Sequence, residues 1–429
     1  MTSHTDRAPD AVLRCRQCEQ PFRFDALDSG YGFGHCVCRQ IPVAEDVLFA
    51  DGDELQRRLT EVNRQGDREQ ARALVLGKHW HRGHRGGNAG ARFQRFVRHR
   101  FLGDVTSRFH LLPLLRRLPR TRLTKTLIAA AQWNPYMRYR FSAPSMLANV
   151  PLLGLLLKRE GLVLDAPCGM GHLSFLLSKV VPPHHLVCMD LSPAFVYSAR
   201  RFFVPGIAAA IVHDMSFPLP LGASEFGAVF CADAFHYVKD RVGLAREFMR
   251  LIRQDGVIVL AHAHNRLQAN AYAGYAMSPA EYAALFNGHA VRIFPESYVL
   301  DAYLDNAPLD LTRQFGPDDL ASSPALVVIA AKSADAFQVI PPVRERLINA
   351  STNPRPSELY RRHRRGDTIV FERRVPDGLR DDFAASREVL PQRVVIPESS
   401  LVRENGQERF LNYRELLANH VLVDVPEHY

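Results

Sequence analysis

Glycines and acids recur in the middle of this 429-residue chain, at the points where short apolar segments end. The first segment runs into a turn that starts at Asp165 and contains Gly169 and Gly171, where the backbone can approach a ligand closely. Asp190 ends the second segment and Asp214 ends the third. Carboxylates there can accept hydrogen bonds from ribose hydroxyls and from an adenine amine. This order of groups predicts a nucleoside pocket without a cradle for several phosphates.

The apolar segments that position these groups alternate with helical patterns. Strands are predicted at 162–165, 186–190, 209–214, 226–231 and 257–261, and the segments 290–294 and 325–330 can complete the sheet. Strand–helix alternation of this kind predicts right-handed crossovers and a mostly parallel, doubly wound α/β sheet. Ligands of such sheets bind at the carboxyl ends of the strands. A dinucleotide fingerprint requires a third glycine where this chain has Ser174, which disfavours NAD.

Five segments in this order resemble the motifs of class I S-adenosylmethionine-dependent methyltransferases. They are residues 163–171, 189–191, 212–215, 226–238 and 251–260. The resemblance implies a Rossmann-like, seven-stranded methyltransferase sheet and the cofactor S-adenosyl-L-methionine. It implies that Asp165 and the two glycines hold the methionine part, Asp190 the ribose and Asp214 the adenine. The residues it assigns to cofactor binding are Asp165, Ala166, Cys168, Gly169, Gly171, Asp190, Leu191, Asp214, Met215 and Cys231.

Histidines near the ends of the fourth and fifth strands are the candidates for a general base. A hydroxyl or amine acceptor can require such a base. His236 and His264 follow strand ends and are the predicted catalytic residues, with His262 on the same strand as a third candidate. The alternative is that His236 packs as a structural residue.

Four cysteines near the start predict a metal site. Cys15 and Cys18 form a C-x2-C pair, and Cys36 and Cys38 form a C-x-C pair seventeen residues later. Such knuckles bring four thiolates together around structural Zn²⁺, and the absence of a secretion signal disfavours disulfides. His35 is an alternative ligand, and reduced thiols without metal are the competing interpretation. The module resembles N-terminal zinc ribbons of some methyltransferases.

Composition and charge divide the chain into four predicted parts. They are a zinc-ribbon-like module at 1–50, a basic helical linker or lid region at 51–159, the methyltransferase core at 160–332, and an α+β extension of unknown role at 333–429. Residues 51–76 are expected to form one charged helix. Residues 78–140 contain 15 Lys or Arg and one acid, a net of +14 in a chain of net charge +9. Within them, His79, His81 and His84 indicate a flexible basic loop.

These features favour an enzyme that methylates an O, N or C nucleophile of a small molecule. The first alternative is an rRNA or tRNA methyltransferase that uses the ribbon and the basic segment to hold RNA. The second is a non-catalytic binding or scaffold protein with the same fold. No apolar run reaches the ~18 residues of a membrane span, and the first residues have no apolar leader, so we expect a cytoplasmic protein. The oligomeric state is open, with a homodimer as one option.

Overall fold

The computed structural model describes residues 13–24, 28, 30–50, 54–75, 139–270, 274–375, 385–404, 407–427 and 429. The basic segment 78–140 lies outside the described residues except for its last two, and so do His79, His81 and His84. Among the residues described, no helix is long and apolar enough to cross a membrane.

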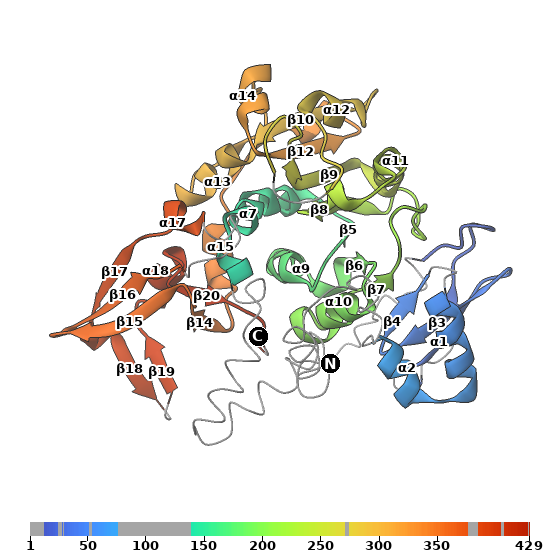
Figure 1. Ribbon diagram of the computed structural model, residues 1–429, viewed down its shortest axis with the longest axis horizontal. Coiled ribbons are helices and arrows are strands. Elements are labelled where there is room, and N and C mark those ends of the chain that lie inside the picture. The colour runs from blue at the N-terminus through green and yellow to red at the C-terminus, as the bar shows by residue number, and fades with distance from the viewer. Residues whose placement is uncertain are drawn as a thin grey trace, which may run out of the picture.

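One eleven-stranded sheet forms the centre of the molecule (Figure 1). In chain order its strands are β1 (Arg23–Phe24), β2 (Gly32–His35), β3 (Gln40–Ala44), β4 (Val47–Phe49), β5 (Leu162–Asp165), β6 (Leu186–Asp190), β7 (Ala209–Val212), β8 (Phe226–Ala232), β9 (Ile252–His264), β10 (Ala290–Pro295) and β12 (Ala325–Ala331). Their spatial order is β1-β2-β3-β4-β7-β6-β5-β8-β9-β12-β10. The strands from β4 to β9 in this order are parallel. β12 runs antiparallel to β9, and β10 runs antiparallel to β12 and hence in the direction of the parallel strands. The seven predicted core strands are therefore confirmed.

Helices cover both faces of this sheet. Successive residues of its strands point to opposite faces, and both sets are apolar. Val163 and Cys188 face a core shared with α9 (His172–Leu177) and α10 (Pro193–Ser198). Their neighbours Leu164 and Met189 face the opposite core, shared with α11 (Arg241–Leu251). Buried strands of this type read as continuous apolar runs. Further helices of the central part are α7 (Pro144–Leu147), α8 (Asn149–Leu152), α12 (Pro279–Ala284), α13 (Glu296–Leu304) and α14 (Pro317–Ser322), with short turns at η4 (Arg140–Ser142), η5 (Leu153–Lys158), η7 (Ala199–Phe203) and η8 (Phe235–Tyr237).

The N-terminal strands continue the central sheet. β4 pairs in parallel with β7, through Leu48 opposite Ile211 and Phe49 opposite Val212. The predicted single helix at 51–76 is wrong in one respect, because the segment forms two helices, α1 (Glu54–Gln65) and α2 (Arg68–Val75). Gly66 separates them at a φ of 72°, a left-handed conformation that ends a helix readily at glycine.

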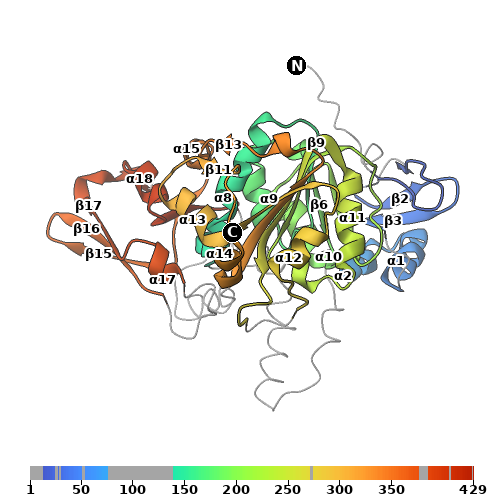
Figure 2. The ribbon, with the colours of Figure 1, turned by 90° about the horizontal axis from the view of Figure 1, so that it is seen from above.

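The C-terminal part contains small sheets that project from the central one (Figures 1 and 2). Its described strands are β13 (Val339–Ile340), β14 (Pro354–Pro356), β15 (Tyr360–Arg365), β16 (Thr368–Arg373), β17 (Arg393–Pro397), β18 (Leu401–Glu404), β19 (Gln407–Phe410) and β20 (Leu422–Asp424). β13 pairs with β11 (Leu309–Asp310), a strand that precedes β12 in the chain. Its helices are α15 (Arg344–Asn349), α17 (Ser386–Val389) and α18 (Tyr413–Ala418). Ile369 and Leu416 belong to a separate small apolar core in this part. The predicted α+β character agrees with this arrangement.

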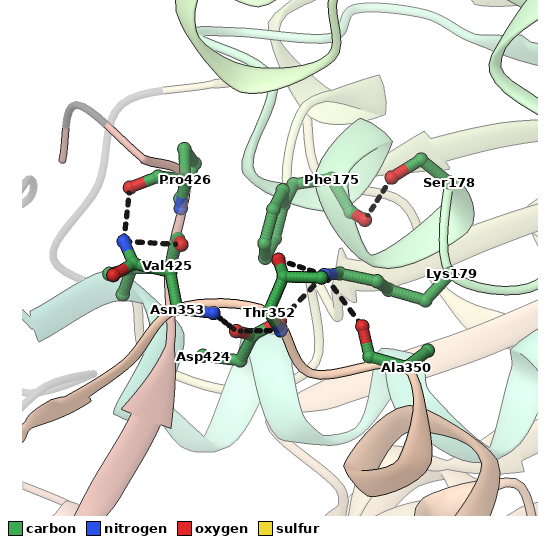
Figure 3. Close-up of polar contacts among 9 residues, drawn as sticks. All are labelled: Phe175, Ser178, Lys179, Ala350, Thr352, Asn353, Asp424, Val425 and Pro426. Carbon is green, nitrogen blue, oxygen red and sulfur yellow. Dashed lines mark hydrogen bonds and ion pairs between the residues drawn. The ribbon is translucent and has the colours of Figure 1, made fainter. Parts of the chain in front are cut away.

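A buried ion pair joins the C-terminal part to the central sheet (Figure 3). Lys179, just beyond α9, places its Nζ 2.7 Å from Asp424 Oδ2 in β20, and the two side chains are only 10% and 14% exposed. The same ammonium donates to the Ala350 carbonyl at 3.1 Å and lies 4.4 Å from the centre of the Phe175 ring. Asp424 Oδ1 accepts the amide N–H of Thr352 at 3.0 Å. Both charges are thus compensated by several partners.

We expect Lys179→Ala to lower the free energy of unfolding by about 3 kcal/mol, because removing one partner leaves the buried Asp424 carboxylate uncompensated. Urea denaturation of the full chain measures this loss. The exposed pair Arg57–Glu54 supplies the control, since Arg57→Ala should cost less than about 1 kcal/mol. Equal losses in the two variants would contradict the anchoring role of Lys179.

Candidate functional site

The turn after β5 is held from both sides by buried acids. Asp165 is 1% exposed and accepts a hydrogen bond from Ser174 Oγ in α9 at 2.5 Å. Burial, with a smaller contribution from the Asp190 charge, raises the pKa of Asp165 to about 7. Asp165 therefore connects β5 to α9 in this structure, in addition to any contact it makes with a ligand.

Asp190 fixes the glycine turn through backbone donors. Its Oδ2 accepts the Gly169 amide at 2.9 Å, and its Oδ1 accepts the Ser192 amide at 2.8 Å. Burial raises the pKa of this carboxyl group, although the amide hydrogen bonds oppose the change. Gly171 has a φ of 98°, and a Cβ there would lie 2.9 Å from the Ala199 Cα. Close packing of the start of α9 against η7, which begins at Ala199, therefore requires glycine at this position.

The side chains just after β6 and β7 differ in how far they are exposed to solvent. Asp214 is half-buried and accepts the Ser216 amide at 2.8 Å, and Met215 is buried beside it. Leu191 follows Asp190 and is 60% exposed, and Phe217 follows the end of β7 and is 58% exposed. The structure thus brings two acids and two exposed apolar side chains to the carboxyl ends of adjacent strands. An adenosine group fits this combination, because its polar edges need acceptors and its ring needs apolar cover.

Three further predicted cofactor residues have small side chains that are packed in the sheet cores. Ala166, Cys168 and Cys231 all belong to the apolar cores of the sheet. Burial raises the pKa of the thiols of Cys168 and Cys231, which therefore stay protonated. Their predicted contacts with a cofactor remain predictions, and only backbone atoms are suited to polar contacts there.

The histidines lie together at the ends of β8 and β9. The rings of His236 and His264 stack with their centres 3.6 Å apart and their planes 14° apart, and the ring of His262 lies 5.3 Å from that of His264. Asp233, which follows β8, completes the group with His262 Nε2 3.9 Å from its Oδ1. The structure thus brings the three candidate histidines together, while their catalytic roles remain predictions.

Two further charged residues of this cluster were missed by the sequence analysis. Arg140 Nη1 lies 3.0 Å from Asp233 Oδ2, and Glu296 Oε2 lies 2.7 Å from His262 Nδ1. Arg140 lies in η4, ahead of the first strand of the core, and Glu296 begins α13, so neither belongs to one of the five motifs. Only their buried pairing in three dimensions identifies them.

The charges set the protonation of the cluster. Burial, together with the neighbouring His264, lowers the pKa of His236 to about 3, and burial with His262 lowers the pKa of His264 to about 4. Burial also opposes protonation of His262, but the Glu296 carboxylate outweighs it and raises that pKa to about 9. Burial raises the pKa of Asp233, but the positive charges of Arg140 and His262 outweigh this effect, so the pKa is lowered. At neutral pH, two stacked neutral imidazoles therefore lie beside two ion pairs.

The four N-terminal cysteines converge as predicted. Cys38 Sγ lies 3.3 Å from Cys15 Sγ, 3.5 Å from Cys36 Sγ and 3.6 Å from Cys18 Sγ. All four sulfurs lie within 4.8 Å of one another, and His35 is not part of this group. Cys36 Sγ also accepts the Arg39 amide at 3.3 Å. Burial of the Cys15 thiol is outweighed by amide donors from Cys18 and Gln17, which lower its pKa to about 6. Four sulfurs at this separation fit tetrahedral Zn²⁺.

Comparisons with known proteins concern the central part of the chain. Residues 164–260 match the family model described as a methyltransferase domain. The chain is 27% identical over 104 residues to the 2-methyl-6-phytyl-1,4-hydroquinone methyltransferase of a Synechocystis species. The aligned residues make up 24% of this chain and 32% of that protein. The chain is 27% identical over 141 residues to the trans-aconitate 2-methyltransferase of Methylobacterium radiotolerans, which covers 32% of this chain and 51% of that protein.

The chain therefore spans between a third and a half of the length of these curated relatives. Among solved structures, a putative methyltransferase of Bacillus halodurans is similar at 15% identity and a TM-score of 0.30, covering 44% of this chain and all of that one. The family match confirms the resemblance that the five sequence motifs indicated. Residues 164–260 therefore form a methyltransferase domain, as the five motifs indicated.

Proposed function

We propose that this protein transfers a methyl group from S-adenosylmethionine to a small molecule. The observation that carries the proposal is the pairing of the Gly169 amide with Asp190 at the carboxyl edge, within the segment that matches a methyltransferase domain. The retained turn and both strand-end acids favour this function over a non-catalytic scaffold.

Each part of the cofactor has a matching group in the chain. The Gly169–Gly171 turn would lie against the methionine part, Asp190 would accept from the ribose, and Asp214 would accept from the adenine. Leu191 and Phe217 supply exposed apolar surface beside these acids. When bound, the sulfonium supplies a methyl group that is already activated for transfer. The protein then has mainly to hold an acceptor in line with it, which can contribute roughly 7–11 kcal/mol.

We assign the acceptor side to the cluster at the ends of β8 and β9. His236 and His264 form the stacked aromatic pair of this cluster, and Arg140 and His262 are paired with carboxylates beside them. The two curated relatives are named for a phytyl-bearing hydroquinone and for trans-aconitate, which both carry oxygen groups. By analogy, we infer a small acceptor that presents an oxygen to this cluster.

RNA is the second candidate acceptor, and one observation favours it. Strand β15 is the basic sequence Tyr360–Arg365, and five of its six residues are exposed. A row of arginines suits a phosphate backbone. The strand belongs to the projecting C-terminal sheets, whereas the acceptor cluster lies in the central sheet, so we favour the small molecule.

We expect S-adenosylhomocysteine to bind the full chain with one site, and Asp190→Asn to weaken this binding by about 10- to 100-fold. The asparagine cannot accept as strongly from a ribose, and such charged hydrogen bonds contribute about 1.5–3 kcal/mol. Isothermal titration calorimetry measures both affinities. Asp301→Asn, an exposed acid on α13, is the matched control and should bind unchanged. No heat from the unaltered protein would overturn the proposal.

The acceptor class can be tested with a labelled methyl donor. We expect label to pass into a small-molecule extract containing hydroquinones and organic acids, and not into total RNA. If RNA is the acceptor instead, labelling should fall steeply between low and moderate salt, since phosphate contacts are lost with counterion competition. Salt-sensitive labelling of RNA alone would replace the small-molecule proposal with the RNA alternative.

We also propose that the four cysteines hold one structural Zn²⁺. All four ligand positions are protein sulfurs, so the ion has no open position for substrate. The ion would crosslink two loops, because Cys15 lies in the loop after Leu13 and Cys38 lies in the loop after β2.

Modifying the thiols of the native protein should release one zinc per chain, because only thiolate-bound metal is freed by such a reagent. Cys15→Ser with Cys38→Ser should abolish this release and speed amide hydrogen exchange in β2 and β3. Cys188→Ala, a buried core cysteine, is the control and should keep its zinc. Release of less than about half an equivalent from freshly purified protein would contradict the zinc assignment.

A further inference from the structure

A second group of metal-ligating side chains lies in the acceptor cluster. Asp233, His236 and His264 bring one carboxylate and two imidazoles together, with their ligand atoms within 4.8 Å of one another. Asp233 follows β8, His236 lies in η8, and His264 is the last residue of β9. All three therefore come from the carboxyl edge of the sheet, beside the turn assigned to the cofactor.

His236 lacks the hydrogen bonds that a buried imidazole normally makes. Its side chain is fully buried, at 0% exposed, and neither Nδ1 nor Nε2 has a hydrogen-bond partner. Burying a polar group without a partner costs free energy, and native proteins rarely leave one in this state without a reason. A ligand bound at the cluster would supply the missing partner of one ring nitrogen.

Asp233 is held in place by residues outside the trio. Arg140 Nη1 is paired with its Oδ2 at 3.0 Å, which leaves Oδ1 on the side of the histidines, 3.9 Å from His262 Nε2. The residue adopts a φ of 54°, which is uncommon for a non-glycine residue. Supporting groups of this kind orient the carboxylates of metal sites and are needed for tight binding.

We propose that Asp233, His236 and His264 bind one divalent transition-metal ion, with Asp233 Oδ1 and one nitrogen of each imidazole as ligands. Two imidazoles and one carboxylate are a donor set suited to Fe²⁺, Mn²⁺, Co²⁺ or Zn²⁺. An ion with bonds of about 2.1 Å draws its ligands to roughly 3–3.5 Å from one another. Binding therefore requires the ligand atoms to approach and one of the stacked rings to rotate.

This site differs from the cysteine site in the positions that remain open. Four thiolates close a tetrahedral site, whereas three protein ligands leave at least one position for an oxygen of another molecule. An acceptor hydroxyl bound there would become more acidic and easier to deprotonate. That role rests on the proposed methyl transfer, but ion binding itself does not require it.

Co²⁺ titration of the metal-free full chain separates the two sites, because only thiolate ligation produces a sulfur-to-cobalt charge-transfer band. We expect two Co²⁺ per chain, one that develops this band and one that shows only weaker visible bands. His264→Gln and Asp233→Asn should each lose the second ion, or bind it at least about tenfold more weakly, and keep the charge-transfer band. His289→Gln, an exposed histidine, is the control and should retain both ions.

Binding of S-adenosylhomocysteine by the same variants shows that they are folded and separates this proposal from the proposed function. Variants that lose the second ion but still bind the nucleoside support the metal site. Uptake of only the thiolate-bound ion by the unaltered chain overturns it, and so does retention of both ions by the two variants. Either result leaves the nucleoside-binding prediction standing, because no cofactor is present in the titration.

Discussion

The candidate site depends on the hydrogen bond from the Gly169 amide to the Asp190 carboxylate. Asp190 is buried at the end of β6, where an unpaired carboxylate would be unstable, so its backbone donors are needed to keep it charged. The same bond fixes the conformation of the turn after β5. One contact therefore joins the ends of two neighbouring strands. Parallel pairing of β5, β6, β7, β8 and β9 then brings the strand-end acids and the histidines to the same edge.

The core of the fold could be predicted because its signals are local. Apolar runs that end in Asp165, Asp190 or near Asp214 indicate buried parallel strands with polar ends, and the structure has them. The convergence of the four cysteines could also be predicted, since their spacing alone implies two facing knuckles. In contrast, the pairing of β4 with β7 depends on contacts between distant segments and has no signature in either strand.

The acceptor side shows where sequence patterns stop being informative. His236 and His264 could be placed by strand ends, but Arg140 and Glu296 reach the cluster from elements that carry no motif. A motif position also does not say which way a side chain points. Ala166 and Cys231 lie within the matching segments, yet their side chains are packed in the sheet core. Asp165 similarly uses its carboxylate to hold α9 through Ser174. The charges of such a cluster follow from burial and pairing, which only the three-dimensional structure shows.

The attachment of β4 to β7 also has a consequence for solubility. Without the N-terminal strands, β7 would be the outermost strand of the parallel sheet and would present a row of unsatisfied amides and carbonyls to other molecules. With them, the sheet ends on that side, among the residues that the structure describes, at β1, which is two residues long. A short terminal strand is a poor template for pairing with another copy of the chain. By covering β7, the N-terminal strands β1 to β4 reduce the tendency of the sheet to pair edge to edge with another copy.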